Sequence, residues 1–186
     1  MKLWTFLVTL LIIACAVPCL AQDAEEAEGP VAPKQLNGFS RWTGSWTGEM
    51  EFIADGTPYL TADATFTFAK VLDGFYYKAN WSLVSKKDAK ADDEFSQRGE
   101  TFLSWDDEEE QISAYTFDNM TTSPYGGFGN FDDKGDLVLQ IDDEDGPFSR
   151  EVWELSSAKT LLYRQEDWDP EKKDWVLSRR CKYTQK

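Results

Sequence analysis

The sequence contains no histidine among its 186 residues. Histidine is the general base of Ser-His-Asp and Cys-His nucleophile systems, and it supplies ligands in the HExxH zinc motif and in histidine-ligated haem sites. Its absence excludes these forms of chemistry. We therefore expect no catalytic residues of these types, no metal site and no cofactor.

Long hydrophobic runs are also missing, apart from one near the start of the chain. Met1–Ala21 has the features of an export signal: Lys2 precedes the apolar run Leu10–Val17, and small residues lead to the expected cleavage after Ala21. The run is shorter than the roughly 20 residues of a membrane-spanning helix. We expect a secreted or periplasmic protein without a membrane span.

Cysteine is scarce, and only Cys181 follows the expected cleavage site. No internal disulfide is then available, so packing alone must stabilise the fold. A second interpretation of the leader takes Ile12-Ile13-Ala14-Cys15 as a lipoprotein cleavage motif, which would leave a lipid anchor on Cys15. The apolar residues that follow Cys15 are unusual for a lipoprotein tether, so we favour plain secretion.

Charge of one sign dominates, with 34 acidic and 19 basic residues and a net charge of −15. Such an excess repels nucleic acid and anionic lipid surfaces, so we expect neither as a partner. Residues 22–34 carry several acids and prolines and no large aromatic side chain, which predicts a disordered acidic leader. The remaining residues, 35–186, are long enough for one domain, which we expect to be a monomer or a weak oligomer.

Apolar and polar side chains alternate from Trp46 to the end of the chain. In Thr61–Leu72 and again in Phe75–Leu83 every second residue is apolar, which is typical of strands with one buried face. Only Lys34–Trp42 can form a helical turn or two. The pattern fits an antiparallel barrel or a sandwich, and a barrel leaves no exposed edge. We expect an all-β, up-and-down barrel of about nine or ten strands.

A set of short motifs follows the chain in a recognisable order. They are Gly44-Ser45-Trp46-Thr47-Gly48, Leu72-Asp73-Gly74-Phe75, Gly99, Leu103-Ser104-Trp105-Asp106, Phe117-Asp118-Asn119 and the region 127–135. In these motifs the region 36–182 resembles a family of secreted bacterial domains of unknown function with a lipocalin-like (calycin) barrel. The related nitrobindin-type barrels bind haem through a histidine, which this chain lacks, so the resemblance does not imply haem binding.

The first motif also resembles the G-x-W element that opens the first strand of lipocalins. There the tryptophan plugs the closed end of the barrel, and an arginine from the last strand lies across its ring. In the last predicted strand Arg179 alternates in step with four apolar residues: Trp175, Leu177, Cys181 and Tyr183. We therefore expect Arg179 to lie over Trp46 and close the barrel, with Trp42 as a lid on the same end.

Three functional hypotheses follow from a barrel of this kind. The first is a cavity for a small apolar or amphipathic ligand. Its predicted lining is Phe66, Phe68, Tyr77, Trp81, Tyr115 and Tyr163. The second is a non-catalytic surface or interaction protein in which the same side chains fill the core. The third, which we favour least, is a carboxylate-based hydrolase, because nearly all the acids fall in predicted turns; a buried acid with a raised pKa would support it.

Overall fold

The computed structural model describes residues 30–86, 94–143 and 146–186. The predicted export signal, including Cys15, and residues 22–29 of the predicted leader lie outside these ranges. Val31–Lys186 form one compact unit. No helix in the described ranges is both long and apolar enough to cross a membrane.

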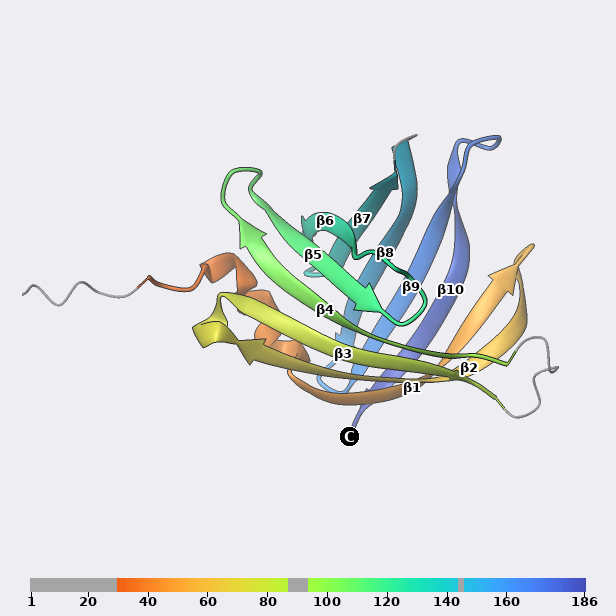
Figure 1. Cartoon of the computed structure of the whole chain (residues 1–186), viewed down its shortest axis with the longest axis horizontal. Helices are drawn as coiled ribbons and strands as arrows, with labels where there is room; N and C mark the ends of the chain where they lie inside the picture. Colours follow the sequence, from red (N-terminus) through yellow and green to blue (C-terminus); the bar gives the residue numbers. More distant parts are fainter. Residues whose placement is uncertain (1–29, 87–93, 144–145) are drawn as a thin grey trace, which may run out of the picture. The chain divides into compact units, whose positions relative to one another are not determined.

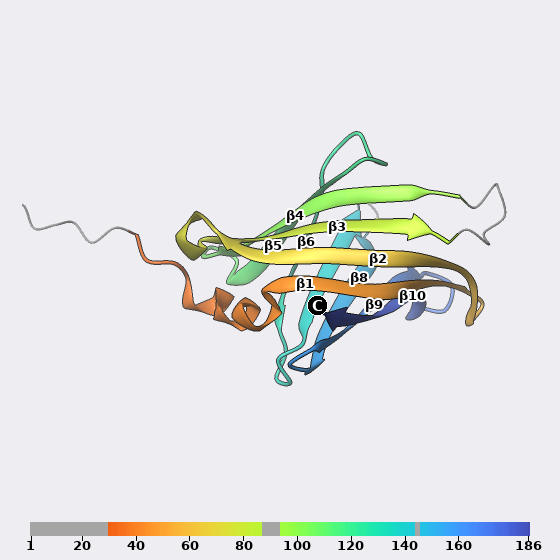
Figure 2. The same ribbon diagram turned by 90° about the horizontal axis from the view of Figure 1, so that it is seen from below.

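Ten antiparallel strands make up the compact unit (Figure 1). They are β1 (Gly44–Ala54), β2 (Thr57–Val71), β3 (Tyr76–Ser85), β4 (Ser96–Asp106), β5 (Gln111–Asp118), β6 (Tyr125–Phe131), β7 (Leu137–Asp143), β8 (Gly146–Ser157), β9 (Thr160–Asp169) and β10 (Asp174–Gln185). Each strand pairs with its neighbours in sequence, as Figure 2 shows for β1 to β4, and β1 pairs with β10 to close the barrel. The predicted all-β, up-and-down barrel is confirmed.

Apolar and polar residues alternate along the strands, so the apolar side chains form a core inside the barrel. In β2 the side chains of Ala62, Ala64, Phe66 and Phe68 are buried, whereas the residues between them are exposed. The motif at residues 72–74 forms a short 3-10 segment, η2 (Leu72–Gly74), that joins β2 to β3. The two strands thus form a hairpin, with Phe66 paired with Trp81.

The sequence did not reveal β6 as a separate strand, because its glycines hide the alternation. Gly126, Gly127 and Gly129 have no side chains to mark an inner and an outer face. A Cβ at Gly129 would overlap the carbonyl oxygen of Val138 on β7. Glycine therefore allows the backbones of β6 and β7 to approach closely at this point.

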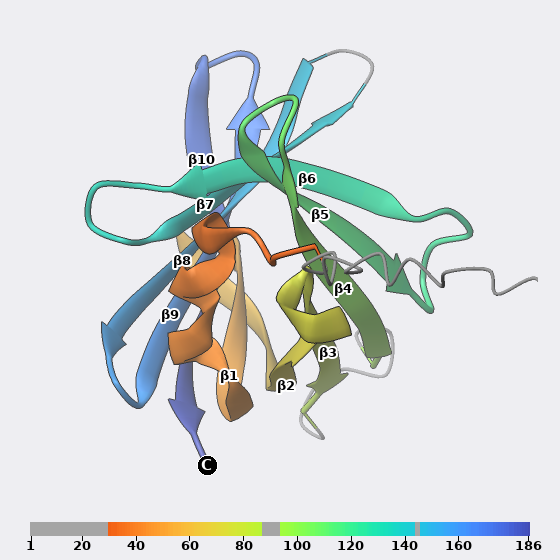
Figure 3. The same cartoon turned by 90° about the vertical axis from the view of Figure 1, so that its left-hand side faces the viewer.

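One end of the barrel is covered by the 3-10 helix η1 (Lys34–Trp42), as Figure 3 shows. Leu36, Phe39 and Trp42 recur every three residues, which is the period of a 3-10 helix, and all three are buried. Phe39 is completely buried, and its ring centre lies 5.5 Å from that of Phe68 and 5.2 Å from that of Tyr77. The short helical segment predicted for these residues thus plugs the barrel with aromatic rings.

Trp46 is completely buried at the same end of the barrel. Its ring stacks on Phe66 with 5.8 Å between ring centres, and its Nε1 donates a hydrogen bond of 2.8 Å to the carbonyl oxygen of Trp42. Arg179 does not lie over it. The register pairs Trp46 with Gln185 and Arg179 with Phe52, and the Arg179 guanidinium lies 5.1 Å from the centre of the Phe52 ring. The predicted contact between Arg179 and Trp46 is therefore wrong.

Candidate functional site

The barrel encloses a cavity of about 530 Å³ between the end covered by η1 and the opposite mouth. Its floor is apolar and contains Trp42, Phe66, Phe68, Leu137 and Trp153. Phe148 also lines the cavity but is 55% exposed, which marks the mouth. The volume falls within the range of pockets that hold small molecules, which is about 300 to 1,000 Å³.

Four of the six residues predicted to line a cavity do so. They are Phe66, Phe68, Trp81 and Tyr163. The Trp81 Nε1 donates a hydrogen bond of 3.2 Å to Thr101 Oγ1, which fixes the indole against the wall. Thr101 Oγ1 in turn lies 2.9 Å from Thr116 Oγ1.

The other two predicted residues lie elsewhere. Tyr77 is buried, but its ring stacks on Phe68 at 5.4 Å and belongs to the aromatic plug beneath η1, outside the cavity lining. Tyr115 is 55% exposed on the outer face of the barrel. Its assignment to the lining is wrong because Ile112 and Ala114 are the inward residues of β5, and Tyr115 has the opposite parity.

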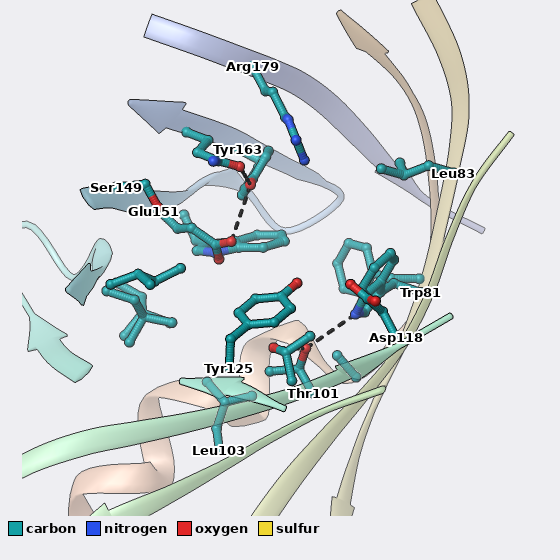
Figure 4. Close-up of a pocket in the computed structure, with 18 of the residues that line it drawn as sticks. Trp81, Leu83, Thr101, Leu103, Asp118, Tyr125, Ser149, Glu151, Tyr163 and Arg179 are labelled. Carbon is teal, nitrogen blue, oxygen red and sulfur yellow. Dashed lines mark hydrogen bonds between the residues drawn. The ribbon is translucent and has the colours of Figure 1, made fainter. Parts of the chain in front are cut away.

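A row of polar side chains crosses three strands of the cavity wall. Glu151 on β8 pairs with Gln165 on β9, and Gln165 pairs with Arg179 on β10. All three line the cavity, together with Tyr163 from the next row toward η1. Figure 4 shows the Arg179 side chain extending toward the same interior space as Glu151 and Tyr163.

Glu151 is the central acid of this row. Its Oε2 accepts a hydrogen bond of 3.2 Å from Trp153 Nε1, and its Oε1 lies 3.3 Å from the Tyr163 hydroxyl. Removal from bulk water raises the pKa of Glu151, although the hydrogen bonds from Trp153 and Tyr163 and the charge of Arg179 act in the opposite direction. The carboxyl group is therefore biased toward its neutral form.

Asp118 lies on the opposite wall and differs from Glu151. Its Oδ1 accepts hydrogen bonds from the backbone N–H groups of Met120 and Thr121, both at 2.8 Å, and its Oδ2 accepts one of 3.2 Å from Gln97. Burial tends to raise the pKa of Asp118, but these hydrogen bonds outweigh burial and lower it below its ordinary value. Asp118 is thus an ionised carboxylate that holds the turn after β5.

Tyr125 on β6 joins the two walls. Its hydroxyl points into the cavity between Asp118 and Glu151 (Figure 4). Burial, together with the charges of Glu151 and Asp118, raises the pKa of Tyr125 far above its ordinary value. A hydrogen bond between the hydroxyl and Asp118 acts in the same direction. The phenol therefore stays protonated.

Nothing in the described part of the chain indicates a metal centre or a reactive thiol. No group of three or more cysteine, aspartate or glutamate side chains is arranged there to hold a metal ion. Cys181 is buried, and burial raises the pKa of its thiol to about 12. The thiol is therefore protonated at neutral pH and is not a nucleophile.

The sequence contained a signal for Glu151 that the alternation could have revealed. Glu151 shares the parity of the apolar residues Trp153 and Leu155 in the same strand, so an inward position follows for it. An acid among inward residues of a strand indicates either a buried partner or a binding site. Asp118 and Tyr125 lie beside turns, where alternation gives no such signal.

Comparisons with solved structures identify the architecture. The S-type phycobiliprotein lyase CpeS from Guillardia theta matches with a TM-score of 0.55 and 12% identity, over 81% of this chain and 91% of that one. Rv2717c from M. tuberculosis matches with a TM-score of 0.60 and 10% identity, over 83% of this chain and 99% of that one. The fold is a lipocalin-like barrel. No family model and no curated protein sequence matches the chain.

Proposed function

We propose that this lipocalin-like barrel binds a small amphipathic molecule in its cavity. The observation that carries the proposal is the interior space of about 530 Å³, which has an apolar floor and a polar row nearer the mouth. An apolar body packed against Phe66, Phe68 and Trp153 would be removed from water, while a polar head would meet Glu151 and Arg179. The alternative of a filled core is less well supported, because a cavity of about 530 Å³ remains beside the aromatic rings that pack beneath η1.

Hydrolysis by paired carboxylates finds less support than binding. Glu151 and Asp118 line one cavity with pKa values shifted in opposite directions, which is a pattern of acid–base pairs. However, both oxygens of Asp118 accept hydrogen bonds from the protein, and its role in the turn at Met120 and Thr121 accounts for its ionised state. A general base is most effective when its pKa lies near the working pH, and the lowered pKa of Asp118 makes it a weak base.

Titration with N-phenyl-1-naphthylamine tests the binding proposal. This neutral aromatic probe fluoresces more strongly in apolar surroundings, so the wild-type protein should give a saturable increase. The Ala79→Trp variant adds an indole where a small side chain now lines the cavity, and it should weaken binding about tenfold or more. Tyr115→Ala, on the outer face, is the matched control and should bind as the wild type does.

Two results of this titration would contradict the proposal. One is the absence of a saturable signal in a wild-type protein whose circular dichroism shows an intact β-barrel. The other is equal affinity in the wild type and a folded Ala79→Trp variant, because the probe would then bind outside the cavity.

We also propose that the protein is exported, with cleavage after Ala21. The support is the charged residue, apolar run and small residues of Met1–Ala21. Intact-mass measurement of the protein from an exporting bacterial host should give a chain that begins at Gln22. A mass that includes a diacylglyceryl group on Cys15 would instead establish a lipoprotein, and an uncleaved chain would contradict export.

A further inference from the structure

The carboxylate groups that line the cavity already receive hydrogen bonds from the protein. Asp118 accepts from two backbone N–H groups and from Gln97. Glu151 accepts from Trp153 and lies in contact with Tyr163. At the mouth, Asp142 accepts a hydrogen bond of 2.8 Å from Gln140. Each of these carboxylates is therefore already stabilised without a ligand.

Arg179 is in the opposite situation, since its donors are unused. Among the described residues that line the cavity, it is the only one with a cationic side chain. Its guanidinium packs over Phe52, and no hydrogen bond or ion pair of this group occurs within the described residues. Five N–H donors in a planar fork are thus available to an acceptor that enters from the mouth.

None of the described neighbours of Arg179 forms an ion pair with it. Glu151 is in the same cross-strand row, yet it does not form an ion pair with Arg179 and is biased toward its neutral form. The hydroxyl of Tyr125 points toward the same space (Figure 4). A partly desolvated cation beside neutral hydrogen-bonding groups is stabilised by an anion that can accept hydrogen bonds.

We propose that the head group of the ligand is a carboxylate held by Arg179. The proposal rests on the proposed function, because it requires the cavity to take an amphipathic molecule. The carboxylate would accept two parallel hydrogen bonds from the guanidinium, and the apolar body would lie against the floor formed by Phe66, Phe68 and Trp153. The ligand class is then an apolar carboxylic acid.

Three compounds with one apolar body and different head groups test this proposal: dodecanoate, dodecanol and dodecylamine. Isothermal titration at pH 7.5 should give dodecanoate an affinity at least about tenfold higher than dodecanol, because charge-assisted hydrogen bonds are stronger than neutral ones. Arg179→Met should remove this preference while affinity for dodecanol changes less than about threefold. Arg179→Lys keeps the charge but loses the fork, and it should give an intermediate result.

The neighbouring residue supplies a matched control. Arg180 is exposed and forms an ion pair with Glu51 on the outer face of the barrel. Arg180→Met removes the same charge from the same strand, and it should leave the affinity for dodecanoate unchanged. Equal losses in Arg179→Met and Arg180→Met would indicate a general effect of charge and would overturn the proposal.

The remaining outcomes separate this proposal from the proposed function. If dodecanol binds as tightly as dodecanoate, or dodecylamine binds most tightly, the carboxylate proposal is wrong while the ligand-binding cavity stands. If Arg179→Met keeps the full preference for dodecanoate, the assignment of Arg179 is wrong. If neither these compounds nor N-phenyl-1-naphthylamine bind to the folded wild-type protein, both proposals fail.

Discussion

The carboxyl group of Glu151 lies 3.3 Å from the phenol oxygen of Tyr163. The same phenol oxygen lies 3.2 Å from Oε1 of Gln165, whose Nε2 donates a hydrogen bond to Asp167. Tyr163 has one hydrogen and faces two acceptors, so it can donate to only one of them. Both contacts are hydrogen bonds when Glu151 is protonated and donates to Tyr163, which donates to Gln165.

Replacing Glu151 by glutamine should therefore change how stability depends on pH. A raised folded-state pKa means that the contribution of Glu151 is fully present below its unfolded pKa of about 4.3 and is lost as pH rises through the folded value. The glutamine in Glu151→Gln stays neutral at every pH. The free energy of unfolding of the variant minus that of the wild type should therefore rise with pH above about 4.3, by up to roughly 1.4 kcal/mol per pH unit. Urea denaturation between pH 4 and 8 measures this difference. A difference that does not vary with pH would show that folding leaves the pKa of Glu151 unshifted.

Removing the ring of Phe39 should destabilise the barrel by about 3 to 5 kcal/mol. Phe39 is completely buried beneath η1 and contacts the rings of Trp42, Phe68, Tyr77 and Phe131. Urea unfolding of Phe39→Ala gives the value. Tyr115→Ala removes an exposed ring and should cost less than about 1 kcal/mol. Similar losses in both variants would mean that η1 does not plug the barrel.

Gly99→Ala should disturb the wall of the cavity through Trp81. Gly99 pairs with Trp81 across β3 and β4, and a Cβ at Gly99 would lie 2.5 Å from the indole and 2.6 Å from the carbonyl oxygen of Phe117. The ring must then shift, which should cost about 1 to 3 kcal/mol and break its hydrogen bond to Thr101. Unfolding experiments and a shift of tryptophan emission measure the two effects. A variant with wild-type emission and stability would place the indole elsewhere.

Ser149→Ala is expected to leave the protein equally stable or to stabilise it by up to about 1 kcal/mol. The Ser149 hydroxyl is buried, and its oxygen has no hydrogen-bond partner among the described residues. Its removal therefore loses no hydrogen bond and relieves a desolvated polar group. Thr101→Val provides the contrast, because it breaks the contacts with Trp81 and Thr116 and should cost about 1 to 2 kcal/mol. The midpoint of thermal unfolding should fall in Thr101→Val and should stay unchanged or rise in Ser149→Ala.

Alternation predicted the faces of β2 and β3 because the pleat of a strand gives neighbouring side chains opposite directions. It failed where the backbone departs from a regular ladder. In β10 the register shifts between Leu177 and Arg179, which indicates a bulge at Ser178. Before the bulge, Trp175 lies on the outer face of the barrel, beneath Arg150. After the bulge, Arg179 lies on the inner face although it has the same parity as Trp175. Parity across a bulge is lost, and bulges have no reliable sequence signature.

The candidate site was only partly accessible to sequence reasoning. Large inward aromatics such as Phe66 and Trp81 followed from alternation, but the open volume between them depends on how their rings pack, which no pattern of residue types encodes. The position of Arg179 over Phe52 depends on the register of β1 and β10. Register depends on the whole set of strand pairings, which the sequence of one strand does not reveal. The predicted contact of Arg179 with Trp46 was wrong for this reason.

The pairing of β1 with β10 joins the first and last strands of the barrel. Trp46 and Gln185 thus belong to one ladder, although the other eight strands separate them along the chain. A nascent polypeptide that has not yet produced β10 leaves β1 and β9 with open hydrogen-bonding edges, which invite association with other chains. Closure must therefore follow the synthesis of β10, and until then a chaperone that covers these two edges would prevent such association.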